Sequence, residues 1–323
     1  MIVKTSKILA AGLCLFGGAI VVFFGLTQPE TVVPALNAFL MIGLGLGLGL
    51  VLHHRFGLPW GLYGAGAATF ILSQVGHIPF NIYVLNPLTE KLALQPVPGS
   101  ANLAILAVLL GLSAGIFEET ARYLALRFWR RDVRSWRLSM MFGAGHGGIE
   151  AVLVGLLAFL GFLQLVFYRQ FDPQVVTGLA EGPQLEALRL TLQTYWGYNW
   201  YEHLWGSLER FSVLPIHLSA TVMVYYSVRR KNLLWYLAAV FWHALVDFFA
   251  VFAIQTWSIP VTEGIILALG LLSWGIVFLL REKDLPVEPG QEQLESVTEP
   301  PAVQLTPAEK QLTTRDLEES RYE

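Results

Sequence analysis

Charge and cysteine are scarce in this sequence. Only 14% of its 323 residues are Asp, Glu, Lys or Arg, whereas about 25% would be usual in a soluble domain. Hydrophobic residues make up 54% of the chain, and the mean hydropathy is +0.54. The single cysteine, Cys14, lies inside an apolar run, so a disulfide framework is excluded. This composition indicates a polytopic membrane protein.

Three functional signatures are also missing. The chain has no dense basic stripe, which argues against a nucleic-acid partner. It has no His-Glu-x-x-His zinc motif and no glycine loop of the phosphate-binding type. Any chemistry must therefore be carried by residues that come from several hydrophobic segments.

Hydrophobic runs long enough to cross a bilayer recur along most of the chain. They cover residues 8–26, 34–52, 59–84, 101–128, 138–167, 206–228, 233–254 and 260–280. Backbone groups in lipid must be satisfied within the protein, and helices do this segment by segment. We therefore predict an all-α, polytopic membrane helix bundle with about eight transmembrane helices.

The composition changes at the C-terminal end of the last run. Residues 281–323 hold eleven acidic and five basic residues and are rich in Pro, Gln, Glu and Thr. Such a segment cannot bury enough apolar surface to fold alone. We predict a transmembrane domain over 1–280, with its core catalytic helices at about 101–254, and a disordered, acidic cytoplasmic tail over 281–323.

Basic residues are distributed unequally between the two sides of this bundle. Arg55, the five arginines of 127–137 and the basic residues of 229–231 flank one side. The loops of the other side carry a sparser set, Lys91, Arg169 and Arg189. The positive-inside rule then places both termini in the cytoplasm.

Four of the hydrophobic runs contain ionisable residues in their interior. These residues are Glu118, Glu119, Arg122, His146, Glu150, His217, His243 and Asp247. A charged side chain near the membrane centre is costly, so such residues are rare and usually face a protein-lined or watery cavity. We take these eight as the candidate catalytic residues.

Four of the eight fall at the same depth. Glu118, His146, His217 and His243 each lie nine to twelve residues from the basic flank of their run. At about 1.5 Å per residue this is roughly 13–18 Å, near the middle of a core about 30 Å thick. Unrelated polar residues would scatter in depth, so we expect these four to form one site.

Spacing within the runs suggests how the histidines are oriented. His146 and Glu150 are four residues apart, as are His243 and Asp247, so each pair shares one helix face. A neighbouring carboxylate can fix the tautomer and orientation of a histidine, whether the ring acts as a base or as a metal ligand.

A similar spacing relates Arg122 to the two adjacent glutamates. Glu118 and Arg122 are four residues apart, and Glu119 is the neighbour of Glu118. Two adjacent carboxylates in a low dielectric disfavour each other's ionisation. Arg122 can keep one of them ionised, so Glu119 and Arg122 are expected to tune Glu118.

Three readings of these residues remain open from chemistry alone. A glutamate can activate water as a general base while histidines stabilise an oxyanion. Alternatively His146, His217 and His243, or two histidines with a glutamate, can bind zinc or another divalent metal. Both arrangements hydrolyse an amide. The residues could also serve only as interhelical hydrogen bonds that hold the bundle together.

The combined pattern resembles a clan of intramembrane proteases. The elements are Glu118-Glu119-x-x-Arg122, Phe142-x-x-x-His146 running into Gly-Ile-Glu150-Ala, His217, and His243-x-x-x-Asp247. The clan includes the type II CAAX prenyl endopeptidases and the PrsW proteases. Over about 101–254 the chain is most similar to the YhfC family of intramembrane metalloproteases. The glutamate pair is one residue closer to its arginine than in CAAX enzymes, and Asp247 stands where they often have Asn, which favours the YhfC or PrsW side.

The resemblance implies a hydrolase that cleaves a peptide bond in or near the bilayer. It implies water activation by Glu118 with His146, and oxyanion stabilisation or metal ligation by His217 and His243 with Asp247. The expected partner is a membrane-embedded protein or peptide in a bacterial plasma membrane. The alternatives are a proton- or metal-coupled transporter and a non-catalytic membrane protein of the same clan that binds rather than cleaves.

Overall fold

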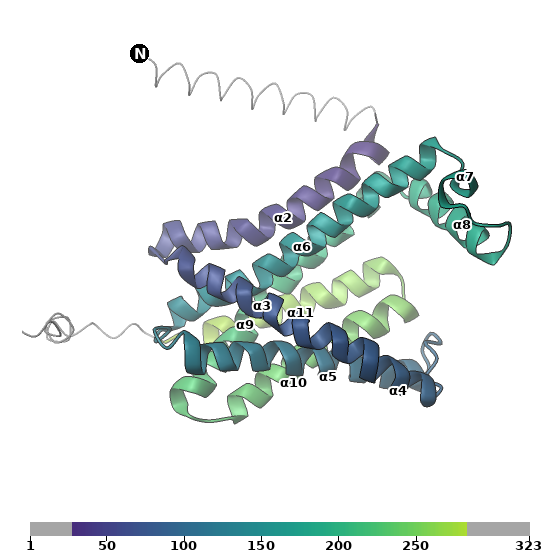
Figure 1. Cartoon of the computed structure of the whole chain (residues 1–323). Helices are drawn as coiled ribbons and strands as arrows, with labels where there is room; N and C mark the ends of the chain where they lie inside the picture. The colour runs from purple at the N-terminus through teal and green to yellow at the C-terminus, as the bar shows by residue number, and fades with distance from the viewer. Residues whose placement is uncertain (1–27, 283–323) are drawn as a thin grey trace, which may run out of the picture. The chain divides into compact units, whose positions relative to one another are not determined.

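The computed structural model describes residues 28–282, and within them helices are the regular secondary structure, with no strand (Figure 1). Seven segments there are long and apolar enough to cross a membrane. They are α2 (Pro29–Phe56), α3 with η1 and α4 (Trp60–Phe80, Asn81–Leu85, Asn86–Lys91), α5 with η2 (Ala101–Leu124, Ala125–Trp129), α6 (Trp136–Gln170), η3 with α9 (Trp200–Leu204, Trp205–Arg230), α10 (Leu234–Thr256) and α11 (Ile259–Leu279). Short helices α7 (Pro173–Thr177) and α8 (Pro183–Gly197) lie between α6 and α9.

The predicted all-α membrane bundle is thereby confirmed. Seven of the eight expected runs correspond to these segments, with ends that differ by a few residues. The third run is longer than expected and reaches Lys91, because η1 and α4 continue the helix. The expected run at 8–26 and nearly all of the predicted tail lie outside the described residues, so the domain boundary at 280 stays a prediction.

Local signals at the ends of the spans are those expected for helices. The Ser100 hydroxyl accepts from the Leu103 N–H at 3.1 Å and begins α5, and Ser135 does the same for α6 with Leu138. Gly57 ends α2 in the left-handed conformation, with φ of 66°. These residues place the polar turns at the ends of the spans.

Helix α9 is the centre of the bundle. In its most apolar stretch 83% of the residues are buried, against 39% or less for each of the other six spans. It packs against α6, α10 and α11, while α5 packs on α10 and both α2 and α3 pack on α6 (Figure 1). A residue on α9 can therefore meet partners from several helices.

The interior of α9 is unusually polar for a buried helix. Its hydroxyl groups bond to carbonyls of the same helix: Ser219 donates to Ile216 and Thr221 to His217, each at 2.8 Å. This local bonding satisfies hydroxyls in the absence of water. The ring of His217, also on α9, has its polar partners on neighbouring helices instead.

The two ends of the helix bundle differ in how many basic residues they carry. We call the end where α5 finishes, α6 begins and α9 finishes the basic end, since Arg127, Arg131, Arg134 and Arg229 lie there. The opposite end, where α6 finishes and α9 begins, we call the loop end. The structure confirms that these arginines share one end of the bundle, and the cytoplasmic location of that end stays a prediction.

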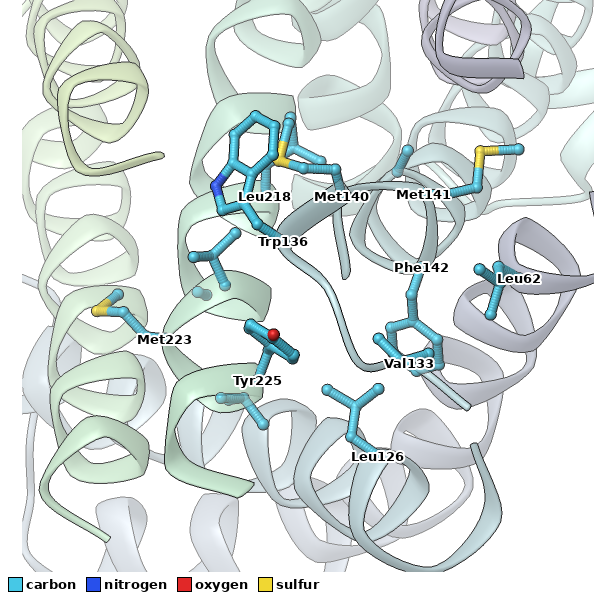
Figure 2. Close-up of a cluster of buried hydrophobic side chains, with 14 of the residues drawn as sticks. Leu62, Leu126, Val133, Trp136, Met140, Met141, Phe142, Leu218, Met223 and Tyr225 are labelled. Carbon is cyan, nitrogen blue, oxygen red and sulfur yellow. The ribbon is translucent and has the colours of Figure 1, made fainter. Parts of the chain in front are cut away.

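A cluster of buried hydrophobic side chains fills the bundle next to the basic end (Figure 2). Leu126, Val133, Trp136 and Tyr225 belong to it, and Phe142 extends it along α6. The Trp136 indole N–H donates to the Val277 carbonyl at 3.0 Å, which ties α6 to α11. This cluster closes the interior of the bundle toward the basic end.

Helices α3 and α6 approach each other closely through two glycines. A Cβ at Gly66 would stand 1.9 Å from the Phe142 carbonyl oxygen, and one at Gly145 would stand 1.9 Å from that of Tyr63. Close approach of this kind is a common use of small residues between membrane helices. It also brings α3 beside the part of α6 that carries His146.

We predict that Gly66→Ala lowers the apparent melting temperature of the purified protein. The added methyl group must push α3 away from α6, and overpacking of this kind costs about 1–3 kcal/mol. Gly64→Ala, in the same helix, is the matched control because nothing lies within 4 Å of its Cβ position. Thermal unfolding in detergent compares the two, and equal stability would show that the crossing is looser than described.

Candidate functional site

The structure brings together the four residues expected at one depth. Glu118 from α5, His146 from α6, His217 from α9 and His243 from α10 are all buried. Glu118 Oε2 lies 3.1 Å from His146 Nε2 and 3.8 Å from His243 Nε2. The ring centroid of His217 is 5.7 Å from those of both His146 and His243. One cluster therefore joins four helices.

Arg122 provides the positive charge of this cluster. Its side chain is fully buried and forms an ion pair with Glu119. Glu119 Oε1 also lies 2.7 Å from His243 Nδ1. Arg122 Nη2 is farther from Glu118, at 3.7 Å from Oε2. The two adjacent glutamates thus differ: Glu119 is bound by Arg122 and His243, whereas Glu118 lies against His146 and farther from Arg122 and His243.

The hydrogen bonds of His146 define which of its nitrogens carries the proton. The Thr69 hydroxyl donates to the Gly66 carbonyl at 2.6 Å, so at 3.0 Å it accepts from His146 Nδ1. In the neutral ring Nε2 is then bare, and it faces Glu118 Oε2. Two acceptors at 3.1 Å repel unless a proton or a cation lies between them. The pair can therefore share a proton or hold a cation between the two atoms.

His217 is held between a cation and an anion. Arg122 can only donate, so its Nη2 donates to His217 Nδ1 at 2.8 Å. On the other side of the ring Glu150 Oε2 lies 2.7 Å from Nε2, although the two groups are poorly aligned for a hydrogen bond. Glu150 in turn accepts from Arg210 Nη1 at 2.6 Å.

The pairing of the carboxylates differs in part from the spacing-based expectation. Glu150 was expected to orient His146, but it pairs with His217 and Arg210 on α9. Asp247 Oδ2 lies 3.6 Å from His243 Nε2, as the spacing predicted. Arg122 was expected to pair with one of the two adjacent glutamates, and that glutamate is Glu119.

A cavity of about 110 Å³ opens beside the cluster. Its polar lining is Glu118, Glu150, Glu209, Arg210, His217, His243 and Asp247. Val213, Ile216, Val246 and Ala250 supply apolar walls. Glu209 lies eight residues before His217 on α9, so the cavity runs from the cluster toward the loop end. Its volume admits a few water molecules.

The residues of the cluster fit a divalent metal ion. One ligand atom from each of Glu118, His146 and His217 lies within 4.8 Å of the others. Two histidines and a carboxylate are a common zinc set, and Nε2 of His146 is already bare. His217 needs an adjustment, because Arg122 occupies Nδ1. Two sets were expected, three histidines or two histidines with a glutamate. The grouping in the structure is of the second kind, and His243 of the first set is engaged with Glu119.

Three residues that contact the cluster were not among the eight candidates. Thr69 orients His146, and Gln74 Nε2 donates to Glu118 Oε1 at 3.3 Å. Arg210 is buried and bonds to Glu150. A hydroxyl in a membrane helix looks ordinary, and Arg210 lies close enough to the end of its run to look like a flank. Its position within the hydrophobic run 206–228 was the one available signal.

A second polar cluster lies between α3 and α5. The Ser113 hydroxyl is 2.8 Å from His77 Nε2, and Asn81 Nδ2 lies 3.0 Å from the same nitrogen. Ser113 is the centre of Gly111-Leu-Ser-Ala-Gly115, which has the Gly-x-Ser-x-Gly spacing of a hydrolase nucleophile elbow. Such an elbow needs a sharp turn, whereas this stretch is inside a helix. Its glycines are explained by packing, since both face carbonyls of α10. The cluster links two helices.

Comparisons with known proteins show the family of the chain. A family model described as YhfC intramembrane metalloprotease matches residues 39–266. The chain belongs to the YhfC family. It is 29% identical over 210 residues to the uncharacterized membrane protein YhfC of Bacillus subtilis (strain 168), covering 62% of this chain and 77% of that protein. No solved structure matches the chain.

The match to the YhfC family model covers more of the chain than the resemblance expected over about 101–254. The matched region includes every candidate site residue and also Thr69, Gln74 and Arg210. The family description is compatible with a metal at the buried glutamate and histidines. The wider similarity to CAAX and PrsW proteases stays a prediction.

We predict that Arg122→Met destabilises this YhfC-family protein by about 3–5 kcal/mol, because it leaves the buried Glu119 carboxylate without its cation. In the double variant Arg122→Met/Glu119→Gln the loss should be smaller than the sum of the two single losses. Unfolding in mixed micelles measures each variant, with the exposed Arg55→Met as the control. Additive losses would show that the two side chains do not interact.

Proposed function

We propose that this protein is an intramembrane peptidase that hydrolyses a peptide bond of a membrane-embedded protein or peptide. The observation that carries the proposal is the pairing of the Glu118 carboxylate with the bare Nε2 of His146, beside a cavity that admits a few water molecules and within a membrane-spanning bundle. The family description supports it. The proposed location is the bacterial plasma membrane, with the basic end toward the cytoplasm.

Glu118 is the proposed general base. A water molecule in the cavity would lie against this carboxylate, which takes a proton as the water oxygen bonds to the scissile carbonyl carbon. His146 Nε2 is within reach to share that proton, and Thr69 keeps the ring in place. The proton then passes to the amide nitrogen, and the carbon–nitrogen bond breaks to release an amine and a carboxylic acid.

The other histidines are the proposed stabilisers of the oxyanion. Glu119 accepts at Nδ1 of His243, and carboxylates lie near Nε2 as well, so the ring suits a positive charge. His217 Nε2 carries the proton of the neutral ring because Arg122 donates to Nδ1. Both rings line the cavity. Fixed donors of this kind stabilise a developing negative charge without reorganisation.

Glu118, His146 and His217 are the proposed ligands if the reaction uses a metal. A divalent ion such as zinc held there would supply Lewis-acid chemistry to the scissile carbonyl. Arg122 would have to release His217 Nδ1, or the ring would have to lose its Nε2 proton. Glu150 and Arg210 would continue to hold the ring in position, in the way that outer carboxylates orient ligand histidines.

We expect Glu118→Gln to abolish peptide cleavage while the bundle stays folded, because the amide keeps the shape of the side chain but cannot accept the proton. The measurement is a mass-spectrometric comparison of new N-termini in membrane proteins from cells that express either form. Wild type should produce N-termini inside hydrophobic segments that the variant does not, with a loss of at least about a hundredfold.

Glu209→Gln is the matched control for this experiment, since Glu209 lines the cavity eight residues from His217 and contacts Arg210. It should keep most of the cleavage. Identical N-termini from wild type and Glu118→Gln would contradict the peptidase assignment. A substrate-independent flux of protons or metal across liposomes would then favour a transporter. The absence of both cleavage and flux would favour a binding protein.

Metal content gives a second test that needs no substrate. If the metal form is correct, protein purified in lipid contains about one zinc or other divalent ion per chain, and His146→Ala loses it because the bare Nε2 is removed. Elemental analysis measures the metal. His77→Ala is the control, as that histidine belongs to the separate cluster with Ser113. No metal in the wild type would support the glutamate form instead.

A further inference from the structure

The basic end contains a hollow that the proposed reaction does not use. Two adjoining cavities of about 380 and 370 Å³ lie there. Arg131 and Val228 line both of them, so we treat the two as one region. We call this space the arginine hollow, and its lining is Leu126, Arg127, Phe128, Arg131, Val133, Arg134, Tyr225, Val228 and Arg229.

Three of the four arginines in this lining have no acidic partner among residues 28–282. Arg229 is paired with Glu282. Arg127, Arg131 and Arg134 are exposed and form no ion pair within the described part of the chain, and Arg134 Nε donates only to the Arg131 carbonyl at 3.3 Å. Three guanidinium groups therefore face the hollow with donors to spare.

The one acid in this connection is neutralised elsewhere. Asp132 accepts from Arg130 Nε at 2.8 Å and from Nη2 at 2.5 Å. The hydrogen bonds from Arg130 lower the pKa of Asp132, with a smaller contribution from the charge of Arg134, so Asp132 stays ionised and its side-chain hydrogen bonds go to Arg130. Arg130 Nη1 also donates to the Gly61 carbonyl, which turns that pair toward α3. The hollow thus keeps its positive charge.

Membrane topology alone does not explain why these arginines line one hollow. The positive-inside rule depends on how many basic residues a loop carries, not on whether they converge. Here they converge from η2, from the turn before α6 and from α9. All the basic residues of the turn are arginines, and the planar guanidinium matches phosphate oxygens in pairs.

The rest of the lining is mostly apolar. Leu126, Val133 and Tyr225 come from the hydrophobic cluster in Figure 2 and form the floor. Phe128 lines the hollow and is 60% exposed on the outside of η2. A water-soluble phosphate would leave these apolar atoms uncovered, whereas a phospholipid covers them with its glycerol and upper acyl chains.

We propose that the arginine hollow binds the headgroup of an anionic phospholipid from the surrounding leaflet. Arg131 and Arg134 hold the phosphate, Arg127 adds charge, and the acyl chains pass Phe128 into the bilayer. Basic pockets between membrane helices are suited to such headgroups. Phosphatidylglycerol therefore binds here in preference to phosphatidylcholine, whose choline group would face three uncompensated cations.

The test is lipid retention by the full chain in detergent. Phosphatidylglycerol or phosphatidylcholine of the same acyl chains is titrated in, and bound lipid is counted by native mass spectrometry. Wild type should retain one phosphatidylglycerol preferentially. Arg131→Gln/Arg134→Gln should weaken its retention by about tenfold or more, given the contribution of each basic residue near an anionic lipid.

The matched control removes two positive charges from the same end but outside the hollow. Arg55→Gln/Lys231→Gln should leave retention within about twofold of wild type. Equal retention by Arg131→Gln/Arg134→Gln and wild type, or an equal loss in the control, would overturn the proposal. Displacement of the lipid by a tenfold excess of glycerol 3-phosphate would also overturn it, because the ligand would then be a soluble phosphate.

A second measurement on the wild-type chain is independent of how the variants fold. Phosphatidylglycerol with a photoreactive group near its headgroup is cross-linked to the protein in lipid nanodiscs, and the labelled peptides are identified. Cross-links concentrated in 126–134 and 225–229 support the site. Cross-links spread evenly over both ends of the bundle contradict it.

Discussion

The burial of Arg122 is the constraint on which the rest of the site depends. A guanidinium inside a membrane bundle must be compensated by charge and hydrogen bonds, since its isolated burial would be prohibitive. Glu119 compensates it within α5, and His217 accepts from it across to α9. Glu119 also bonds to His243 on α10. One buried cation therefore fixes the relative rotation of three helices.

The orientation of His146 depends on the close packing of α3 against α6. Gly66 has no side chain, so α3 can touch the Phe142 carbonyl. The Gly66 carbonyl accepts a hydrogen bond from the Thr69 hydroxyl one turn later. The hydroxyl oxygen can then accept a hydrogen bond from His146 Nδ1. A wider crossing would separate Thr69 from His146, and the bare Nε2 that faces Glu118 would no longer be specified.

Depth was predictable from the sequence, and partners across helices were predictable only in part. Counting residues from the basic flanks placed Glu118, His146 and the other two histidines at one level, because helix rise is constant. The four-residue rule predicted that Glu150 orients His146, but it describes only one helix face. The Glu150 carboxylate instead reaches α9, where it accepts a hydrogen bond from Arg210. Such pairings depend on helix rotation, which tertiary packing decides.

The two ends of the cluster differ in a way that bears on how a peptide could reach it. Buried hydrophobic side chains close the interior toward the basic end, whereas the cavity continues past Glu150 and Asp247 to Glu209 near the loop end. An α-helix with its side chains is about 10–12 Å across, too wide for a cavity of about 110 Å³. A helical substrate would have to unwind before its carbonyl met Glu118. The polar lining of the cavity offers partners for the backbone groups that unwinding exposes, and lipid offers none.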